Sequence, residues 1–334
     1  MSAEPRSPAR LSVTIPVPVA AAPAVARALQ TRRRLTDRVG AIRRSAGFPW
    51  TAPTWPSHIE RPPVEPTLGA DFDTEWSRRL PARVARAVVL DGVLKPAVAV
   101  VASPTVSGLD RLDGFDGPLI FTSNHASHLD TPLLLTSLPD RFRHHTVVAG
   151  AADYFFDRRG KAIVSALALG AVPIDRTAVS RGSLHQFEDL LADGWSLIIF
   201  PEGGRTPDGW TQEFKAGAAY LATRAGVPVV PIHVEGSRRA WRKGGGLHRT
   251  TTHVTFGKPL RPGTTLSQAR ALAAELEQAV AVLGDEQATD WWSARQRAAA
   301  GLTPSLRGPD AGAWRRSWTL GEGRRLESGP RWPS

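Results

Sequence analysis

Cysteine is absent from this 334-residue sequence, and its absence excludes several kinds of chemistry. Without a thiol, the chain forms no disulfide bond, builds no thiolate zinc site and offers no cysteine nucleophile. Proteins without disulfides are typical of the cytosol, which is therefore the expected compartment.

Long hydrophobic runs are also missing. A helix that spans a bilayer needs about 20 apolar residues, whereas the run over 96–109 has only 14 residues. Residues 11–26 contain three prolines and have no convincing cleavage context, so they do not predict a signal peptide. We therefore expect any membrane contact to be peripheral.

Lysine is scarce, whereas arginine is abundant. The chain has 42 Lys and Arg residues against 31 Asp and Glu residues, a formal net charge of +11. The balance favours nucleic acid, an anionic membrane or phosphorylated small molecules as partners, because the planar guanidinium pairs well with phosphate, although a GC-rich genome produces the same bias. No complete nucleic-acid-binding motif occurs in the sequence, so nucleic acid is not an expected partner.

The two ends of the chain differ in texture from its middle. Residues 1–75 are rich in arginine and proline without helical or strand periodicity, and they are predicted to be a disordered tail. Residues 285–334 interleave tryptophan with arginine and are predicted to be a second, largely disordered tail. The folded part is therefore expected between them.

Residues 76–105 have the pattern of amphipathic helices. Apolar residues recur at helical spacing, and arginines and Lys95 lie between them, until Pro96 is expected to break or kink the helix. Two interpretations stay open. The helices lie in a membrane interface, or they form a pair packed on the following domain.

Residues 106–284 alternate strand-like with helix-like segments. Strands are predicted at 118–122, 146–149, 171–174, 195–200, 227–234 and 253–256, and helices at 132–138, 161–169, 184–192, 214–224 and 266–282. This alternation predicts an α/β fold with a largely parallel sheet and flanking helices. Ligands of such sheets bind at the carboxyl ends of the strands, so catalytic and binding residues are expected directly after the apolar runs.

The first polar cluster, Asn-His-Ala-Ser-His-Leu-Asp, directly follows the first predicted strand. His125 and Asp130 are five residues apart, which on a regular helix separates them by ~140°. A strand-to-helix turn can bring them together, and a carboxylate that holds one imidazole nitrogen makes the histidine a general base for an alcohol. The alternatives are a helix-capping Asp130 and a turn histidine, or His128 as the base.

The second cluster, Phe-Pro-Glu-Gly-Gly-Arg-Thr at 200–206, follows another apolar strand. Its glycines allow close backbone approach, Arg205 supplies a two-pronged donor and Thr206 adds a hydroxyl, a set that suits phosphate. A plain glycine-rich turn is the competing interpretation. Arg176 also follows a strand, where it either joins this site or pairs with Asp175 or Glu188.

Four segments, at 124–130, 170–176, 200–206 and 227–231, resemble the four sequence blocks of the glycerolipid acyltransferase family in order and approximate spacing. The family is best known from the 1-acylglycerol-3-phosphate acyltransferases. Each block is common by chance, but all four in order make the resemblance specific. It covers about residues 106–260, so residues 106–284 are the expected acyltransferase domain, with a glycerol-3-phosphate acyltransferase-like fold.

The resemblance implies a function for this domain. The enzyme would transfer a fatty acyl group from acyl-CoA or acyl carrier protein to the hydroxyl of a lysophosphatidate-like acceptor, without a cofactor, as a peripheral protein on the cytoplasmic face of the membrane. It implies His125 as the base and Asp130 as its orienting carboxylate. The residues implied to bind substrate are Arg176, Glu202, Gly203, Gly204, Arg205 and Thr206, with Pro231 in the block associated with the acyl end.

The sequence departs from the usual blocks at three positions. Gly204 stands where threonine is usual, Thr206 where serine is usual, and Pro173 where an aromatic residue is common. These departures concern the identity of the acceptor rather than the chemistry. They leave open whether the acceptor is lysophosphatidate, glycerol 3-phosphate or another lipid.

Rival functions have less support. A metal-dependent hydrolase would use His125, His128, Asp130 and the pair His144 and His145, but no His-Glu-x-x-His spacing occurs. A basic module that binds membranes or nucleic acid would leave the first cluster unexplained. Neither a phosphate-binding loop of the Gly-x-x-x-x-Gly-Lys type nor a Gly-x-Ser-x-Gly elbow is present.

Overall fold

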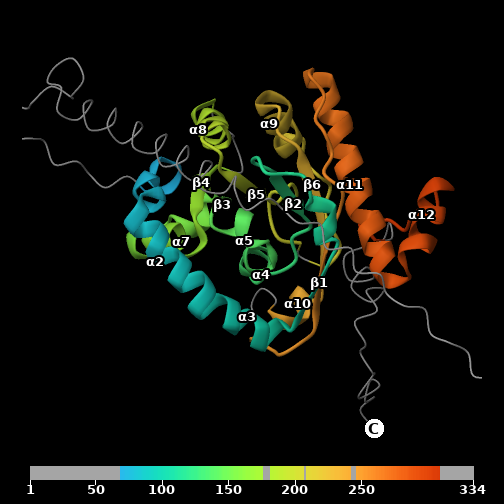
Figure 1. Ribbon diagram of the computed structural model, residues 1–334, viewed down its shortest axis with the longest axis horizontal. Coiled ribbons are helices and arrows are strands. Elements are labelled where there is room, and N and C mark those ends of the chain that lie inside the picture. The colour runs from blue at the N-terminus through green and yellow to red at the C-terminus, as the bar shows by residue number, and fades with distance from the viewer. Residues whose placement is uncertain (1–67, 176–180, 207, 242–245, 309–334) are drawn as a thin grey trace, which may run out of the picture. The chain divides into compact units, whose positions relative to one another are not determined.

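The computed structural model describes residues 68–175, 181–206, 208–241 and 246–308 (Figure 1). The predicted tails at 1–67 and from 309 onward lie outside the described residues, as does Arg176. Everything described belongs to one compact unit that begins at Pro66.

A seven-stranded sheet forms the centre of this unit. Its strands, in the order β1-β7-β6-β2-β5-β3-β4, are β1 (Pro104–Ser107), β7 (Thr252–Phe256), β6 (Val229–Glu235), β2 (Ile120–Ser123), β5 (Ser196–Ile199), β3 (Thr146–Ala151) and β4 (Ala171–Ile174). All neighbours are parallel except β6 and β7, so five strands run one way and the β1–β7 pair runs the other. The predicted α/β fold with a largely parallel sheet is confirmed.

Helices cover both faces of this sheet (Figure 1). The α-helices are α2 (Leu80–Val89), α3 (Lys95–Ala102), α4 (Asp130–Ser137), α5 (Asp140–Arg143), α6 (Ala152–Phe155), α7 (Arg159–Leu169), α8 (Arg181–Ala192), α9 (Gly217–Ala225), α10 (Ser237–Ala240), α11 (Leu266–Ala288) and α12 (Trp291–Ala299). Short 3-10 turns occur at Gly69–Asp71, Glu75–Arg78 and Leu109–Leu112.

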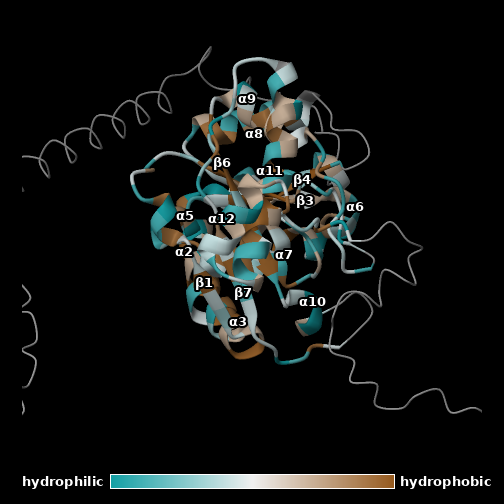
Figure 2. Ribbon diagram, turned by 90° about the vertical axis from the view of Figure 1, so that its right-hand side faces the viewer, coloured by the Kyte–Doolittle hydropathy of each residue, from teal (hydrophilic) through white to brown (hydrophobic). Residues whose placement is uncertain are grey.

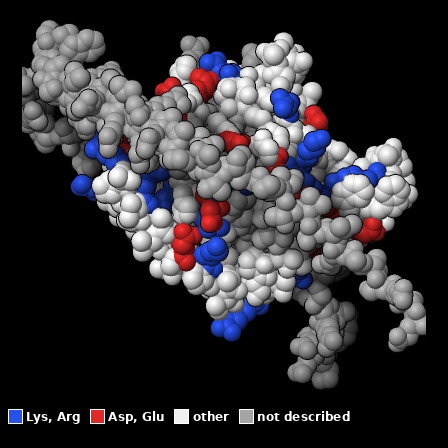
Figure 3. All heavy atoms as spheres, viewed as in Figure 1, with Lys and Arg blue, Asp and Glu red and all other residues white. Residues whose placement is uncertain are grey.

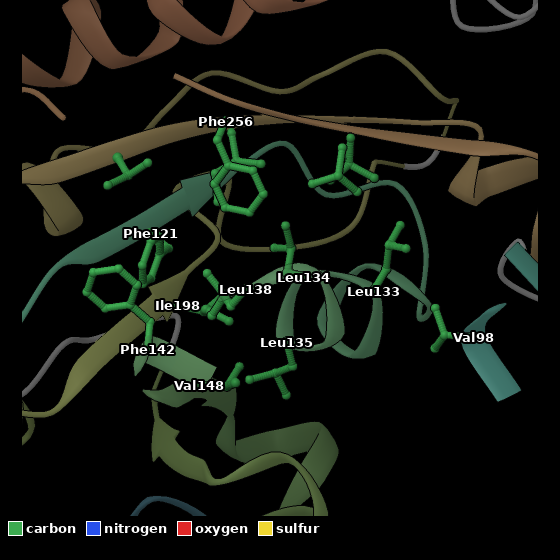
Figure 4. Packing of buried hydrophobic residues seen from close by; sticks show 14 of the residues in the cluster. Val98, Phe121, Leu133, Leu134, Leu135, Leu138, Phe142, Val148, Ile198 and Phe256 are labelled. Atoms are coloured by element: carbon green, nitrogen blue, oxygen red, sulfur yellow. The ribbon is translucent and has the colours of Figure 1, made fainter. Parts of the chain in front are cut away.

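Each central strand sends alternate side chains into two different cores, as the two-residue period of a strand requires. In β2, Phe121 packs with α3 and α4 on one face, and Ile120 packs with α8, α9 and α11 on the other. Figure 4 shows leucines of α4 among Phe121, Phe142 and Phe256. The result is a three-layer sandwich whose carboxyl edge carries the loops that contain both polar clusters.

The predicted strands and long helices match the observed ones to within a few residues. The four-residue elements β1, α5, α6 and α10 were not predicted, because none of them shows a period or lies in an apolar run. In β1 only alternate residues are half-buried, so no apolar run marks it.

Pro96 does not break the helix that precedes it. The chain stays helical from Leu80 to Ala102, and residues Leu90–Leu94 form one wide π turn between α2 and α3. The Lys95 N–H bonds the Leu90 carbonyl five residues back. Proline cannot donate to the turn before it, and the wide turn just ahead of Pro96 accommodates that loss.

The structure corrects the predicted single apolar face of this helix. Leu90 is fully buried in the core, whereas the more exposed apolar residues form a separate stripe on the outside: Leu80, Val84, Val88, Val93 and Val100. Some of the cations turn inward as well. The Arg86 guanidinium bonds the Thr146 carbonyl against Gly170, and burial lowers the pKa of Arg86 to about 10.

The second predicted tail begins with ordered helix. Helix α11 continues to Ala288, and Asp290 caps α12 by accepting hydrogen bonds from two backbone N–H groups. Ion pairs from Arg295 to Glu286 and from Arg297 to Asp285 hold α12 on α11. The proposed boundary at residue 285 therefore falls inside α11, and the tryptophans and arginines that follow it belong in part to α12.

Acidic and basic side chains of the described residues are interspersed on the face drawn in Figure 3. The apolar residues of the strands lie inside the sandwich, and part of α3 is apolar on the outside (Figure 2). No described helix is both long and apolar enough to cross a bilayer.

Candidate active site

The loop from β2 to α4 brings His125 and Asp130 together. The Asp130 Oδ2 atom accepts hydrogen bonds at 2.8 Å from His125 Nδ1 and from the backbone N–H groups of Ala126 and Ser127. The carboxylate is fully buried, and the imidazole is 16% exposed. Asp130 is the first residue of α4 and accepts from residues before it, so it is not a helix cap.

The geometry leaves the second nitrogen of His125, Nε2, to act on a ligand. The ring stacks on Phe200 at a centroid distance of 3.9 Å, which fixes its plane. Phe200 belongs to the second cluster, but no role was predicted for it. The two clusters therefore form one site, with the imidazole held between a carboxylate and an aromatic ring.

Glu202 is buried beneath this site rather than facing a ligand. Its side-chain oxygens accept backbone hydrogen bonds from His125 at 2.6 Å and from Gln212 at 2.9 Å. Burial raises the pKa of Glu202 to about 8, although both hydrogen bonds oppose the rise. The carboxyl group is engaged in positioning the His125 loop, which differs from the phosphate contact that the resemblance implied.

Glu202 gives the folded protein a pH-dependent stability. Between pH 4.5 and about 8 the folded protein holds a proton that the unfolded chain has released, so the free energy of unfolding falls as pH rises through this window. We expect Glu202→Gln, which does not titrate, to flatten the dependence of melting temperature on pH. Glu213→Gln, at a side chain that is 76% exposed, is the control. Parallel curves for the wild type and Glu202→Gln would contradict this assignment.

Thr206 also helps to position the loop that carries His125. Its backbone N–H donates to the His125 carbonyl at 2.9 Å, and its hydroxyl bonds Asp208 and the Gly209 N–H. The side chain is buried. The structure thus brings Thr206 to the site but engages its hydroxyl within the turn.

Arg205 is part of a cluster of cations and aromatic rings near the first polar cluster. Its guanidinium contacts His128 Nε2 and lies 5.4 Å from the centroid of the Tyr154 ring. The Lys161 ammonium lies 3.9 Å from the same centroid. Burial, followed by the charge of Arg205, lowers the pKa of His128 to about 4, so His128 is neutral near pH 7.

The sequence did not predict Tyr154 or Lys161 as site residues. Tyr154 lies on α6 and Lys161 on α7, far along the chain from both clusters, and only the packing of these helices brings them in. His128 contacts Arg205, whereas His125 is hydrogen-bonded to the Asp130 carboxylate. The geometry therefore favours His125 over His128 as the base.

An apolar cavity of about 250 Å³ opens beside His125, between the carboxyl ends of β3 to β5 and helices α8 and α9. Gly203, Gly204 and Lys215 also line it. Its apolar walls include Val148, Ala149, Phe155, Ile174, Leu184, Phe187, Ile199 and Leu221. The cavity suits a hydrocarbon chain whose polar end stays near the imidazole.

Pro231 lies away from this cavity. It sits within β6, in register with Thr122 of β2, and its carbonyl accepts the Gly257 N–H at 2.8 Å. It is buried and does not line the cavity. Its place is in the sheet that supports the site.

The side chains of the rival metal site do not all come together. His144 and His145 precede β3, whereas His125 follows β2, and these strands run parallel to one shared neighbour, β5. The histidine pair therefore lies at the opposite edge of the sheet, where His144 bonds Asp91 and His145 bonds Arg83. Among the described residues, no group of three or more His, Asp or Glu side chains is arranged to hold a metal.

Comparisons with known proteins show what the sequence and the fold are similar to. Residues 103–235 match the family described as Acyltransferase. The chloroplastic 1-acyl-sn-glycerol-3-phosphate acyltransferase BAT2 of Brassica napus is 30% identical over 164 residues, which are 46% of this chain and 44% of the relative. The chloroplastic 1-acyl-sn-glycerol-3-phosphate acyltransferase LPAT1 of Arabidopsis thaliana is 31% identical over 51% of this chain and 48% of the relative. The 1-acyl-sn-glycerol-3-phosphate acyltransferase alpha of Mus musculus is 34% identical over 34% of this chain and 39% of the relative.

The chain thus spans less than half the length of these curated relatives. Its fold is similar to the crystal structure of the 1-acyl-sn-glycerophosphate acyltransferase PlsC from Thermotoga maritima, with a TM-score of 0.50 at 21% identity over 65% of this chain and 83% of the other. The match to the Acyltransferase family thus covers residues 103–235, and the chain is similar to 1-acyl-sn-glycerol-3-phosphate acyltransferases at about 30% identity.

Proposed function

We propose that this protein is an O-acyltransferase that moves a fatty acyl group from a thioester donor to the hydroxyl of a lysophosphatidate-like acceptor. The observation that carries the proposal is the His125–Asp130 pair at the mouth of an apolar cavity. The relatives are named for this activity on 1-acyl-sn-glycerol 3-phosphate. The donor is acyl-CoA or acyl carrier protein.

The mechanism follows from the free nitrogen of His125. The acceptor hydroxyl attacks the thioester carbonyl carbon while Nε2 takes its proton, and Asp130 stabilises the imidazolium through Nδ1. The tetrahedral intermediate collapses by breaking the carbon–sulfur bond, and the thiolate takes the proton from the imidazolium. No covalent intermediate on the enzyme and no cofactor is required.

The two substrates would occupy different sides of His125. The acyl chain would lie in the apolar cavity, where it removes its surface from water. The acceptor phosphate would lie near Arg205, whose guanidinium has no ion pair with a described carboxylate, and near Lys161 on the same Tyr154 ring. Both positive charges therefore act on an anion bound close to that ring.

A direct assay tests the proposed function. The purified full chain is incubated with one labelled acyl-CoA, or the same acyl group on acyl carrier protein, and with lysophosphatidate, glycerol 3-phosphate or monoacylglycerol. The products are identified by mass. We expect phosphatidate from lysophosphatidate, with no loss of rate when a chelator is added. Failure to acylate any acceptor with either donor would refute the proposal.

We also propose that the α2–α3 stripe attaches the protein peripherally to an anionic membrane. Leu80, Val84, Val88, Val93 and Val100 are each more than half exposed. Arg79, which directly precedes α2, is 70% exposed, and Lys95 is exposed at the start of α3. An apolar stripe flanked by cations matches the chemistry of a bilayer interface with anionic headgroups.

Removing the stripe should release the protein from vesicles. Burial of one valine side chain is worth ~1.5 kcal/mol, so we expect Val84→Asp/Val88→Asp to weaken binding to anionic vesicles at least ~10-fold in co-sedimentation. Leu302→Asp, also at an exposed apolar residue, is the matched control. Unchanged binding by the folded double variant would favour the interpretation of helices packed only on the domain.

A further inference from the structure

We propose that Lys215 is a catalytic residue that stabilises the negative charge formed on the carbonyl oxygen of the acyl donor. The inference rests on the proposed acyl transfer and adds a residue to it. Lys215 lies in the loop between β5 and α9, two residues before α9 begins. Neither polar cluster of the sequence contains it.

Lys215 faces the same cavity as His125. Both residues line the space that would hold the acyl chain, whereas Arg205 and Lys161 do not. The Lys215 backbone N–H donates to the Pro201 carbonyl at 2.9 Å, which ties the lysine to the second cluster. The Lys215 charge is thus on the side of the imidazole where the acyl donor would bind, and the Arg205 cluster is on the side of the acceptor phosphate.

Gly203 makes room for the lysine side chain. The glycine has a φ of +73°, and a Cβ atom there would lie 2.8 Å from Lys215 Nζ and 3.3 Å from Cε. The ammonium therefore lies directly against the backbone of the glycine turn, at the polar end of the cavity. A side chain at residue 203 would displace it, so the glycine serves close approach as well as backbone conformation.

Among the described residues, no ion pair accounts for the position of the Lys215 ammonium. Within the ranges that the structure describes, no carboxylate pairs with it, whereas Lys161 forms an ion pair with Asp157 at 3.3 Å. A cation at the mouth of an apolar cavity is poised for an anion brought there by the ligand. The acyl chain places its thioester carbonyl at that mouth, beside His125.

The carbonyl oxygen of the donor becomes an anion only after the acceptor hydroxyl has begun to attack. When the acceptor oxygen bonds the carbonyl carbon, the carbon–oxygen π electrons move to the carbonyl oxygen, which becomes negative. The Lys215 ammonium stabilises this charge, which disappears when the carbonyl re-forms and the thiolate leaves. An interaction made only in the transition state raises kcat rather than lowering KM.

The test compares neutral and cationic substitutions at saturating acyl-CoA and lysophosphatidate. Loss of one oxyanion donor typically costs ~10²–10³ in kcat, so we expect that loss for Lys215→Met and Lys215→Gln, with the KM for lysophosphatidate within about twofold of wild type. Lys215→Arg keeps the charge and should recover at least ~10-fold over the methionine variant. Lys258→Met, at an exposed lysine outside the cavity, is the matched control and should keep the wild-type kcat.

The alternatives give different results. If Lys215 instead binds the acceptor phosphate, the loss appears in the KM for lysophosphatidate and vanishes at saturation, which overturns the proposal. An unchanged kcat, or an equal loss in Lys215→Arg and Lys215→Met with melting temperatures at the wild-type value, also overturns it. Absence of acyl transfer by the wild-type chain refutes the proposed function itself, and that result is separate from any comparison among variants.

Discussion

His125→Ala is expected to abolish acyl transfer while the protein stays folded. The imidazole is the group whose free nitrogen faces the cavity, and removal of a general base typically costs ~10²–10⁴ in rate. The side chain is only partly buried and packs on one ring, so its loss leaves the cores unchanged. Steady-state rates and circular dichroism on the same preparation measure both effects.

Asp130→Asn should be nearly as severe as His125→Ala. The amide oxygen can replace part of the acceptor role toward Ala126 and Ser127, but the negative charge that stabilises the imidazolium is lost. The control is His128→Ala, which removes a histidine three residues away that contacts Arg205 instead of a carboxylate. Full loss in His128→Ala with activity retained in His125→Ala would show that the base has been assigned to the wrong histidine.

Arg205→Lys should lower kcat/KM by ~10- to 100-fold for a phosphorylated acceptor. The substitution keeps the charge and loses the planar two-pronged donor, and a hydrogen bond to a charged group is worth ~1.5–3 kcal/mol. The loss should appear in the KM for lysophosphatidate, with the KM for acyl-CoA near its original value. Kinetic constants for both substrates decide whether the guanidinium acts on the acceptor.

Monoacylglycerol separates this role from a structural one. It has no phosphate, so Arg205→Lys should change its turnover little. Because Arg205 also contacts His128 and Tyr154, a purely structural role would lower the melting temperature and leave the acceptor KM unaltered. Equal kinetic losses on lysophosphatidate and monoacylglycerol would remove the support for a phosphate at this position.

The core of the site could be predicted from the sequence because it is local. His125 and Asp130 are five residues apart in one turn, and an apolar strand before them marks the carboxyl edge of the sheet. The glycines and Arg205 follow another apolar strand in the same way. Neighbouring parallel strands bring these two loops together without any further information.

Other features depend on packing that no local pattern encodes. The inward turn of Arg86 exists because Gly170 has no side chain, and a Cβ there would lie within 2.7 Å of the guanidinium. The burial of Glu202 depends on the Gln212 N–H ten residues away. Tyr154 and Lys161 reach Arg205 only after α6 and α7 have packed, so their chemistry could not be seen from spacing alone.

The wide turn at Leu90–Leu94 changes the direction in which the residues after it face around the helix axis. In a regular α-helix, the five-residue step from Val88 to Val93 would rotate the second valine by ~140° around the axis. A turn with more residues reduces that rotation, so Val93 and, beyond it, Val100 come closer to the exposed side of α2. Two helical segments that would otherwise face different directions thereby present one continuous surface, and adding or removing a single residue between them would divide it.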